Sequence, residues 1–543
     1  MGYSTPSRAL DGGCGLRFRQ ALWLVAALLL LALPGTAPAA DSIVIQRFEI
    51  QGNRILDDDR LQAAVQSFVG PERGIDDIRA ALLAIESAYR AAGYGAVRAV
   101  TPEQEITTGV IRIRVIEAQL GAVEVVGNAH FSDQNVLAGL PALRTGTPPD
   151  LRQLAENLQL ANENPARKSE VLLSATEQEG ILEARVLVED ERPLRLSATL
   201  DNTGNSSTGR HRLGVALQHA NLFDRDHVAT AAYTTSPEEP DQVEIYSFSY
   251  RLPLYSLGDS LDFIFGDSSV ASGTTATVAG PLDFSGDGRV IVARYNHYFP
   301  RRGEYASRLT FGWEQRRYEN ECVIAGVTCG SADADIEVRP ASLTYSGRWD
   351  SPGRVTDFYV SAARNIPGGS RGSSEDFAAI RAGAEADYAL LRAGSSHLRS
   401  LGLWQFRSAL HLQYASGPLI PAEQVSLAGS TATRGFDERA LATDSGVTVN
   451  LELYTPAFTV PAGLPGMLRG VLFVDGAAGR NHDVVSTVQV SEITVASAGV
   501  GLRGELGRRA ALSLDVASVI VEDTATSERS GDVKAHFTIN VLF

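Results

Sequence analysis

Cysteine is scarce in this chain, and its few copies form no metal-binding pattern. The 543 residues include 3 Cys, namely Cys14 and the close pair Cys322 and Cys329. In an oxidising compartment this pair could close a small surface loop as a disulfide, and two free thiols are the alternative. The 9 His are scattered, and no His, Cys or carboxylate cluster has the spacing of metal ligands. We therefore expect no metal site and no cofactor.

Long apolar runs and excess positive charge are lacking as well. Beyond the amino-terminal segment, no stretch approaches the ~20 apolar residues of a membrane helix, so a membrane protein of this sequence must span as a barrel. The formal net charge is −16, which argues against a nucleic-acid partner. A hydrophobic content of 44% with 51 Gly fits strands that are apolar on one face only.

The amino terminus has the pattern of a secretory signal. Three arginines precede an apolar run at 21–33, and small residues at 37–39 offer a cleavage site. The run is too short and wrongly flanked for a spanning helix. We expect residues 1–39 to be removed together with Cys14, which precedes the run and is therefore not expected to carry a lipid.

Residues 41–192 mix helices and strands in the order strand, short helix, helix, strand, strand, and this order repeats. The first copy, 41–118, predicts a strand at 44–51, a short helix at 58–68, a helix with the apolar stripe Ile75, Ile78, Leu82, Ile85 and Tyr89 that ends at Gly93, and a strand at 110–117. The second, 119–192, predicts a strand at 122–126, helices at 133–140 and 151–161, and strands at 171–175 and 182–188. Gly52-Asn53 and Gly127-Asn128 occupy matching turns. A single irregular α+β domain is the alternative.

From residue 193 onward the chain shows almost only strands and turns. Leucines at 194, 196 and 200 alternate with polar residues, and the segment Lys534–Phe543 alternates strictly and ends on an aromatic residue. Polar residues on the second face fit a face that lines water. At roughly 20 to 24 residues per strand and turn, residues 193–543 accommodate about 14 to 16 strands. We expect a transmembrane antiparallel β-barrel, with a soluble β-sandwich or solenoid as the alternative.

One fragment has the residue types and spacing of a nucleotide-binding motif. Gly499, Gly501 and Gly504 have the spacing of the dinucleotide fingerprint, but they lie among strands and lead into residues 511–515, which are not helical in pattern. No phosphate-binding loop is present elsewhere. We expect no enzyme activity and no catalytic residues.

Several motifs recur in an order seen in one protein family. They are the segment Tyr89–Gly127, Asp201-Asn-Thr-Gly204 with Thr208-Gly-Arg210, Asn221-Leu-Phe223, Thr433-Arg-Gly-Phe436 and Phe473-Val-Asp-Gly476. Each motif alone is weak, whereas their order and spacing are specific. Over essentially all of its mature length the chain resembles the TpsB outer-membrane transporters of two-partner (type Vb) secretion, the ShlB/FhaC/HecB haemolysin secretion/activation family.

This resemblance implies two periplasmic POTRA domains followed by an outer-membrane barrel of about 16 strands. Such a protein is a monomer in outer-membrane lipid and exports a large β-helical exoprotein, a TpsA-like adhesin or haemolysin. An exposed POTRA sheet edge could capture the unfolded client as an added strand, and the groove between helix and strand is the other candidate surface. A barrel-assembly factor of the same superfamily is the alternative function, although such factors usually carry more POTRA copies. A passive porin would lack the periplasmic repeats.

The resemblance also implies a loop that folds back into the barrel lumen. Its Arg434, followed by Gly435 and Phe436, would pair with Asp475, and Gly435 and Gly476 would permit close backbone approach. Glu452 is a weaker candidate for the same network, and an arginine in solvent is the alternative. The chain departs from the family in two ways. No amino-terminal plug helix is apparent before the first strand, and Leu427-Ala-Gly429 stands where a double glycine is common.

Overall fold

The structure is a computed structural model that describes residues 43–106, 108–205, 208–270, 273–284, 287–319, 323–324, 327–328, 335–459, 466–483, 490–507 and 509–543. The expected signal at 1–39 and both Cys322 and Cys329 lie outside the described residues, so the cleavage and the disulfide stay predictions. No helix within the described ranges is long and apolar enough to cross a membrane.

The first α+β repeat is a compact unit with a three-stranded sheet. Its elements are β1 (Ile43–Ile45), β2 (Arg47–Gln51), α2 (Asp58–Val65), η1 (Gln66–Phe68), β3 (Gly70–Arg73), α3 (Ile75–Ala92), β4 (Val97–Val100) and β5 (Val110–Glu117). Strand β5 pairs in parallel with β2 and antiparallel with β4. The expected apolar stripe of α3 is wrong at its first member, because Ile75 is 66% exposed whereas Ile85 and Tyr89 are fully buried.

The second repeat has the same topology. It contains β6 (Gln119–Val126), α4 (Asp133–Ala138), α5 (Leu151–Ala161), β7 (Arg167–Ala175) and β8 (Ile181–Asp190). Strand β8 pairs in parallel with β6 and antiparallel with β7, as β5 does with β2 and β4. The two helices and three strands expected in this copy are therefore confirmed, with β7 beginning four residues earlier than expected.

The repeat extends to individual hydrogen bonds. Gly52 and Gly127 both adopt positive φ, 90° and 94°, a region in which glycine has no steric penalty. In each copy the following asparagine donates from Nδ2 to a carbonyl three residues on and to an aspartate five residues on. The strand that ends each copy supplies a carboxylate, Glu117 or Asp190, that accepts backbone N–H groups of the same turn. The internal repeat is confirmed.

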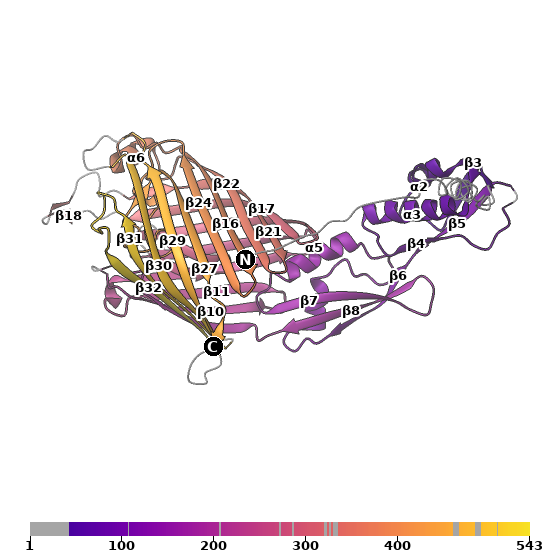
Figure 1. The fold of residues 1–543 in the computed structure, drawn as a ribbon, viewed down its shortest axis with the longest axis horizontal. Coiled ribbons are helices and arrows are strands. Elements are labelled where there is room, and N and C mark those ends of the chain that lie inside the picture. The colour runs from indigo at the N-terminus through magenta and orange to yellow at the C-terminus, as the bar shows by residue number, and fades with distance from the viewer. Residues whose placement is uncertain are drawn as a thin grey trace, which may run out of the picture. The chain divides into compact units, whose positions relative to one another are not determined.

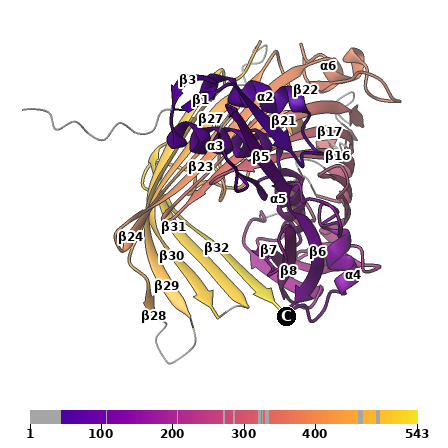
Figure 2. The ribbon, with the colours of Figure 1, turned by 90° about the vertical axis from the view of Figure 1, so that its right-hand side faces the viewer.

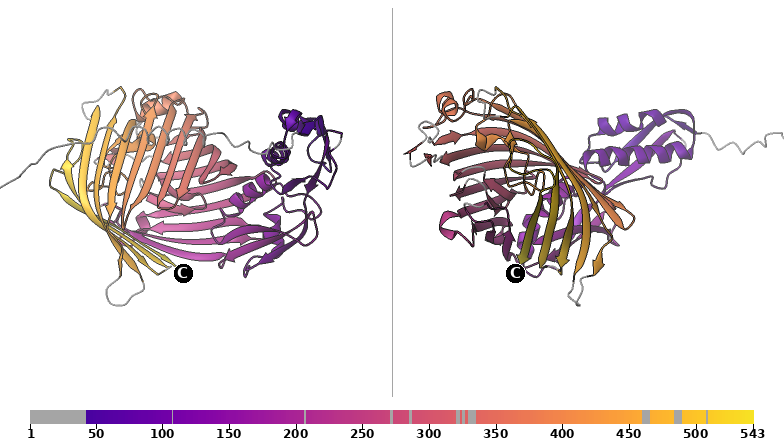
Figure 3. Two further views of the ribbon diagram at one scale, coloured as in Figure 1. Left: turned by 45° about the vertical axis from the view of Figure 1, so that its right-hand side comes forward. Right: turned by 60° about the vertical axis from the view of Figure 1, so that its left-hand side comes forward.

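After the second repeat, the chain forms a closed antiparallel barrel of sixteen long strands (Figures 1 and 3). They are β9 (Leu194–Asp201), β10 (Arg212–Leu222), β11 (His227–Thr235), β12 (Glu244–Leu254), β13 (Asp259–Ser268), β16 (Asp287–Arg302), β17 (Tyr305–Glu319), β21 (Pro340–Ser351), β22 (Arg354–Asn365), β23 (Ala389–Leu401), β24 (Trp404–Ala415), β27 (Ser445–Tyr454), β29 (Met467–Arg480), β30 (Glu492–Leu506), β31 (Ala510–Val521) and β32 (Val533–Leu542). Strand β32 pairs with β9 and closes the wall. Short strands β20 (Ile336–Val338) and β28 (Phe458–Thr459) extend it.

The barrel is apolar outside and polar inside. Leu213, Val215 and Leu217 of β10 are exposed on its outer face, whereas Ser249 and Asp262, on β12 and β13, are buried. A soluble protein has the opposite arrangement, because its apolar side chains face a core away from water. This pattern is that of a barrel set in lipid, and it confirms the expectation of a polar face that lines water.

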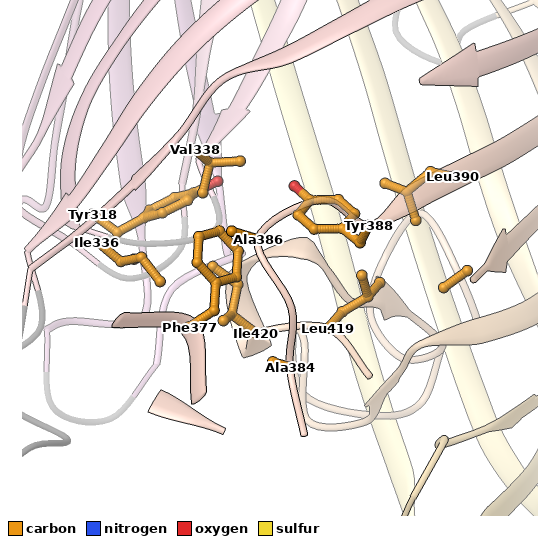
Figure 4. Packing of buried hydrophobic residues seen from close by; sticks show 11 residues of the cluster. Tyr318, Ile336, Val338, Phe377, Ala384, Ala386, Tyr388, Leu390, Leu419 and Ile420 are labelled. Atoms are coloured by element: carbon orange, nitrogen blue, oxygen red, sulfur yellow. The ribbon is translucent and has the colours of Figure 1, made fainter. Parts of the chain in front are cut away.

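At the end of the barrel where the loops after β17, β22 and β24 lie, a small hydrophobic cluster joins these loops (Figure 4). Phe377 of the helix α6 (Ser374–Ile380) is buried there against Tyr388, Leu419 and Ile420. Two hairpins, β14–β15 (Gly273–Thr277 and Gly280–Phe284) and β18–β19 (Val323–Ile324 and Val327–Thr328), also belong to loops at this end.

Candidate functional site: the lumen loop

The loop between β24 and β27, residues 416–444, is the segment that carries Arg434, and we call it the lumen loop. It contains a short helical turn η4 (Pro421–Glu423) and the strand pair β25 (Val425–Ser426) and β26 (Ala442–Thr443). Phe436 is fully buried in a cluster with Ile493, Val495 and Val519, which belong to strands of the barrel wall. An apolar anchor therefore holds the loop against the inner face of β30 and β31.

Arg434 makes a bidentate ion pair with Asp475 of β29. Its Nε donates to Oδ2 at 2.7 Å and its Nη2 donates to Oδ1 at 2.8 Å, and the backbone N–H of Arg434 donates to Oδ2 at 3.2 Å. Both side chains are buried, with 4% of Arg434 and none of Asp475 exposed. Charge-assisted, two-point contacts of this kind combine strength with fixed geometry.

Further charged groups complete a network around this pair. Glu452 of β27 accepts from Nη1 of Arg434 at 2.9 Å and from Arg407 of β24 at 3.0 Å. Asp515 of β31 lies 3.4 Å from Nη1 of Arg434 and binds Arg503 of β30 through two bonds of 2.8 and 2.9 Å. Three arginines thus face three carboxylates, so the buried charges compensate one another.

An aromatic ring lies between Arg434 and a glycine. The guanidinium carbon of Arg434 lies 3.6 Å from the ring centroid of Phe473, a cation–π contact. Phe473 in turn lies over Gly499, where a β-carbon would meet the ring at 2.4 Å and the carbonyl of Val516 at 2.1 Å. At Gly501 a β-carbon would meet the Asp515 carboxylate at 2.2 Å. The Gly-x-Gly spacing noted in the sequence therefore makes room for the lumen network.

The two glycines of the motifs differ in what their sites require. Gly435 has a φ of 98°, its N–H donates to Nε2 of His536 at 3.2 Å, and a β-carbon there would lie 3.4 Å from that of Ala517. Gly476 has ordinary strand geometry, and a β-carbon would meet only the Val495 carbonyl, at 3.9 Å. The positive φ, and not the expected close approach, explains glycine at 435, and neither explains it at 476.

A second buried ion pair secures the base of the lumen loop. Arg381, directly after α6, is bonded through both Nη atoms to the carboxylate of Asp444, and its Nη1 also donates to the carbonyl of Leu419 at 2.6 Å. Asp444 and Leu419 belong to opposite ends of the loop. The α6 segment thus clamps the base, whereas Asp475 holds the tip.

The structure brings together all the residues that the sequence proposed for the loop: Arg434, Gly435, Phe436, Glu452, Asp475 and Gly476. Sequence reasoning missed Asn450, which donates to Asp475 at 2.8 Å and to the Ala432 carbonyl at 2.7 Å. It also missed Arg407, Arg503, Asp515 and His536. Strand alternation places these side chains in the lumen, but only the register of neighbouring strands shows which of them meet.

Comparison with known proteins identifies the family. The model of the haemolysin secretion/activation protein ShlB/FhaC/HecB matches residues 184–504, and a ShlB-type POTRA domain matches residues 43–118. The chain belongs to the ShlB/FhaC/HecB family. It is therefore an outer-membrane transporter of two-partner secretion, with periplasmic POTRA domains, and the family secretes TpsA exoproteins. The family is one of transporters and not of enzymes.

Individual relatives agree over most of the chain. The outer membrane transporter CdiB of Escherichia coli O6:K15:H31 is 23% identical over 472 residues, which cover 85% of this chain and 77% of that protein. CdiB of Dickeya dadantii is 22% identical over 73% of this chain and 68% of its own length. The solved structure of CdiB from Escherichia coli has the same fold, with a TM-score of 0.74, 19% identity and coverage of 97% and 98% of the two chains.

Proposed function

We propose that the lumen loop is a lock: the Arg434–Asp475 pair holds its tip inside the pore in the geometry that export of the exoprotein requires. The supporting observation is the set of contacts that bury and hold Arg434. Arg434 is bonded to Asp475 and Glu452, stacked on Phe473 and almost wholly shielded from water. A loop arginine that served only solubility would remain in solvent.

The energetics of the pair make the lock sensitive to single substitutions. Breaking a buried ion pair by removing one partner costs about 3–5 kcal/mol, because the other charge stays buried without compensation. Phe436 and the Arg381–Asp444 pair hold other parts of the loop independently. Loss of Arg434 therefore frees the tip of the loop while the barrel wall and the base of the loop persist.

The proposed cargo is one unfolded exoprotein of the β-helical class, captured at the edges of the POTRA sheets. We assign residues 41–118 and 119–192 to the two POTRA domains and 193–543 to the barrel. In the part of the second sheet that the structure describes, β7 is bonded to β8 on one side only. Its Leu172 is 42% exposed. An extended segment added at such an edge gains backbone hydrogen bonds, and side chains beside the edge add selectivity.

The test is a comparison of culture supernatant and outer membrane from cells with the gene deleted, complemented with the wild type, or complemented with Arg434→Ala. Arg364→Ala is the matched control, because it removes an arginine whose pair with Asp387 is largely exposed. We expect deletion and Arg434→Ala to remove one large secreted protein at normal barrel abundance, and Arg364→Ala to secrete normally. Broad depletion of other outer-membrane proteins on deletion would indicate an assembly factor instead. Normal secretion by Arg434→Ala would refute the lock alone.

A further inference from the structure

The second POTRA domain is joined to the barrel by a buried polar contact, which the lock does not involve. Nη2 of Arg167, at the start of β7, lies 2.6 Å from Oδ2 of Asp226 in the turn between β10 and β11. The side chains are 0% and 1% exposed. The hydroxyl of Tyr255, from the turn between β12 and β13, donates to the same oxygen at 2.5 Å. Nη1 of Arg167 donates to Asn135 at 2.7 Å.

Other side chains of the domain reach the same two turns and the end of β10. Asn157 of α5 donates to the backbone carbonyl of Tyr255 at 3.0 Å, and Asn164 donates to the carbonyl of Ala220 at 2.7 Å. The hydroxyl of Ser132, the cap of α4, is hydrogen-bonded to the carboxylate of Asp224. We call this set of contacts the joint. It lies at the periplasmic end of the wall, where β8 leads into β9. Figure 2 shows α4, β7 and β8 at this end of the barrel.

The barrel side of the joint is a strained turn that contains the Asn221-Leu-Phe223 motif. Phe223, Asp224 and Asp226 have φ values of 60°, 55° and 59°. Non-glycine residues in this region cost on the order of 1–3 kcal/mol each and persist only where the surroundings fix them. Asn221 supplies part of that fixation, because its Oδ1 accepts from the backbone N–H of Asp226 at 2.9 Å and its Nδ2 donates to Asp224 at 3.0 Å.

The joint places α5 against the inside of the barrel mouth. Gln159 and Glu163, at the carboxyl end of the helix and just beyond it, line a cavity of about 1030 Å³ together with strand residues from β12 to β24. Its other walls are rich in hydroxyl and guanidinium groups, among them Arg294, Arg308 and Thr344. Such groups offer hydrogen bonds to backbone carbonyl and carboxylate oxygens of an extended chain.

We propose that the joint stays closed throughout transport, and that it holds α5 as a fixed wall of a vestibule that the extended exoprotein crosses on its way into the pore. Arg167 and Asp226 are positioning residues in this scheme. Opening the joint would break the Arg167–Asp226 pair together with the hydrogen bonds that Asn157, Asn164 and Ser132 make to the barrel, so several contacts must be lost at once. The inference rests on the proposed function, since it presumes that the lumen is the export path.

The first test locks the joint covalently. Ser132→Cys and Asp224→Cys, in a background with Cys322→Ser and Cys329→Ser, place two thiols at exposed positions that touch in the closed joint. A short methanethiosulfonate cross-linker then joins them and reducing agent releases it. We expect cross-linked cells to secrete the exoprotein at the same rate as the same cells after reduction. A block that reducing agent relieves would show that the domain swings during transport, and would overturn the proposal.

The second test examines the vestibule. A photo-reactive phenylalanine analogue in place of Gln159 should cross-link the exoprotein during secretion, whereas the same analogue in place of Arg152, on α5 but outside the cavity lining, should not. Arg167→Ala should lower secretion at least tenfold and abolish the Gln159 cross-link at normal barrel abundance, and Arg167→Lys should restore part of both. Absence of the Gln159 cross-link while secretion is normal would overturn the vestibule and leave the lock untouched.

Discussion

The two POTRA domains share a fold but differ in what they bury. Among the described residues of the first domain, no polar or charged residue is buried as a whole, and Tyr89 is the buried residue that carries a hydroxyl. The second domain buries Asn135, Asn157, Asn164, Arg167 and Ser169. Four of these five contact the barrel, at β10 and at two turns. Burial of polar side chains is costly unless every group finds a partner. The comparison therefore links the buried polar side chains of the second copy to its contact with the barrel, whereas the turn and the helices are common to both copies.

The largest expected effect comes from the glycine that both copies use in the same turn. A β-carbon at Gly52 would lie 2.4 Å from the carbonyl of Val115, and one at Gly127 would lie 2.5 Å from that of Val188. Each change to Ala adds a strained φ and a backbone clash. We therefore expect each change to lower the free energy of unfolding of its own domain by about 2–3 kcal/mol. Hydrogen exchange of the full-length transporter, read separately for each domain, measures this loss. Unequal losses would mean that docking compensates strain in the second domain.

A smaller effect is expected for the asparagines that follow these glycines. Asn53→Ala and Asn128→Ala each remove two hydrogen bonds, to a carbonyl and to an aspartate. Because both sites are near solvent, we expect about 1 kcal/mol for each change. The same exchange experiment measures it, with exposed Gln51→Ala as a control in the first domain. A loss confined to one copy would contradict the equivalence of the two turns.

The smallest expected effect on stability at neutral pH is that of Tyr89→Phe in the first domain. Burial, together with the hydrogen bond to Glu117, raises the pKa of Tyr89 above its ordinary value. The folded protein therefore favours the neutral phenol. The stability that this contributes is fully present below the unfolded pKa of ~10 and is lost as the pH rises through the folded pKa. Helical circular dichroism, which reports mainly on the POTRA domains, should show melting temperatures that fall more steeply above pH ~10 for the wild type than for Tyr89→Phe. Parallel curves would refute this role of Tyr89.

Sequence periodicity predicted most of the fold. The alternation of apolar and polar residues predicted the barrel and its closing strand, and the matching Gly-Asn turns predicted the repeat. Strand β3 was missed because Gly70-Pro-Glu-Arg73 has no strand pattern of its own and depends on pairing with β1. Ile75 was misplaced because the apolar periodicity of α3 continues one turn beyond the surface that the sheet covers. Local pattern therefore identifies elements, while pairing and burial decide their ends.

The site was predictable only in part, and for a physical reason. Arg434 and Asp475 were found through the family motifs, since nothing local marks two residues 41 positions apart as partners. Asp515 and Arg503 are recognised as partners only once the register of β30 with β31 is known. Arg167 and Asp226, 59 positions apart, had no signal beyond the Asn221-Leu-Phe223 motif. Contacts between distant elements depend on tertiary placement, which a single sequence does not encode locally.

The pairing of β32 with β9 has a consequence for the order of events during assembly. Thr199 and Asn540 are hydrogen-bonded across this seam although 341 positions separate them. Contacts between such distant segments form late, because the intervening chain must first be ordered. Until then the backbone groups along both free strand edges remain unsatisfied, and such edges recruit other strands. The pairing of β32 with β9 thus decides when the barrel ceases to be an aggregation hazard.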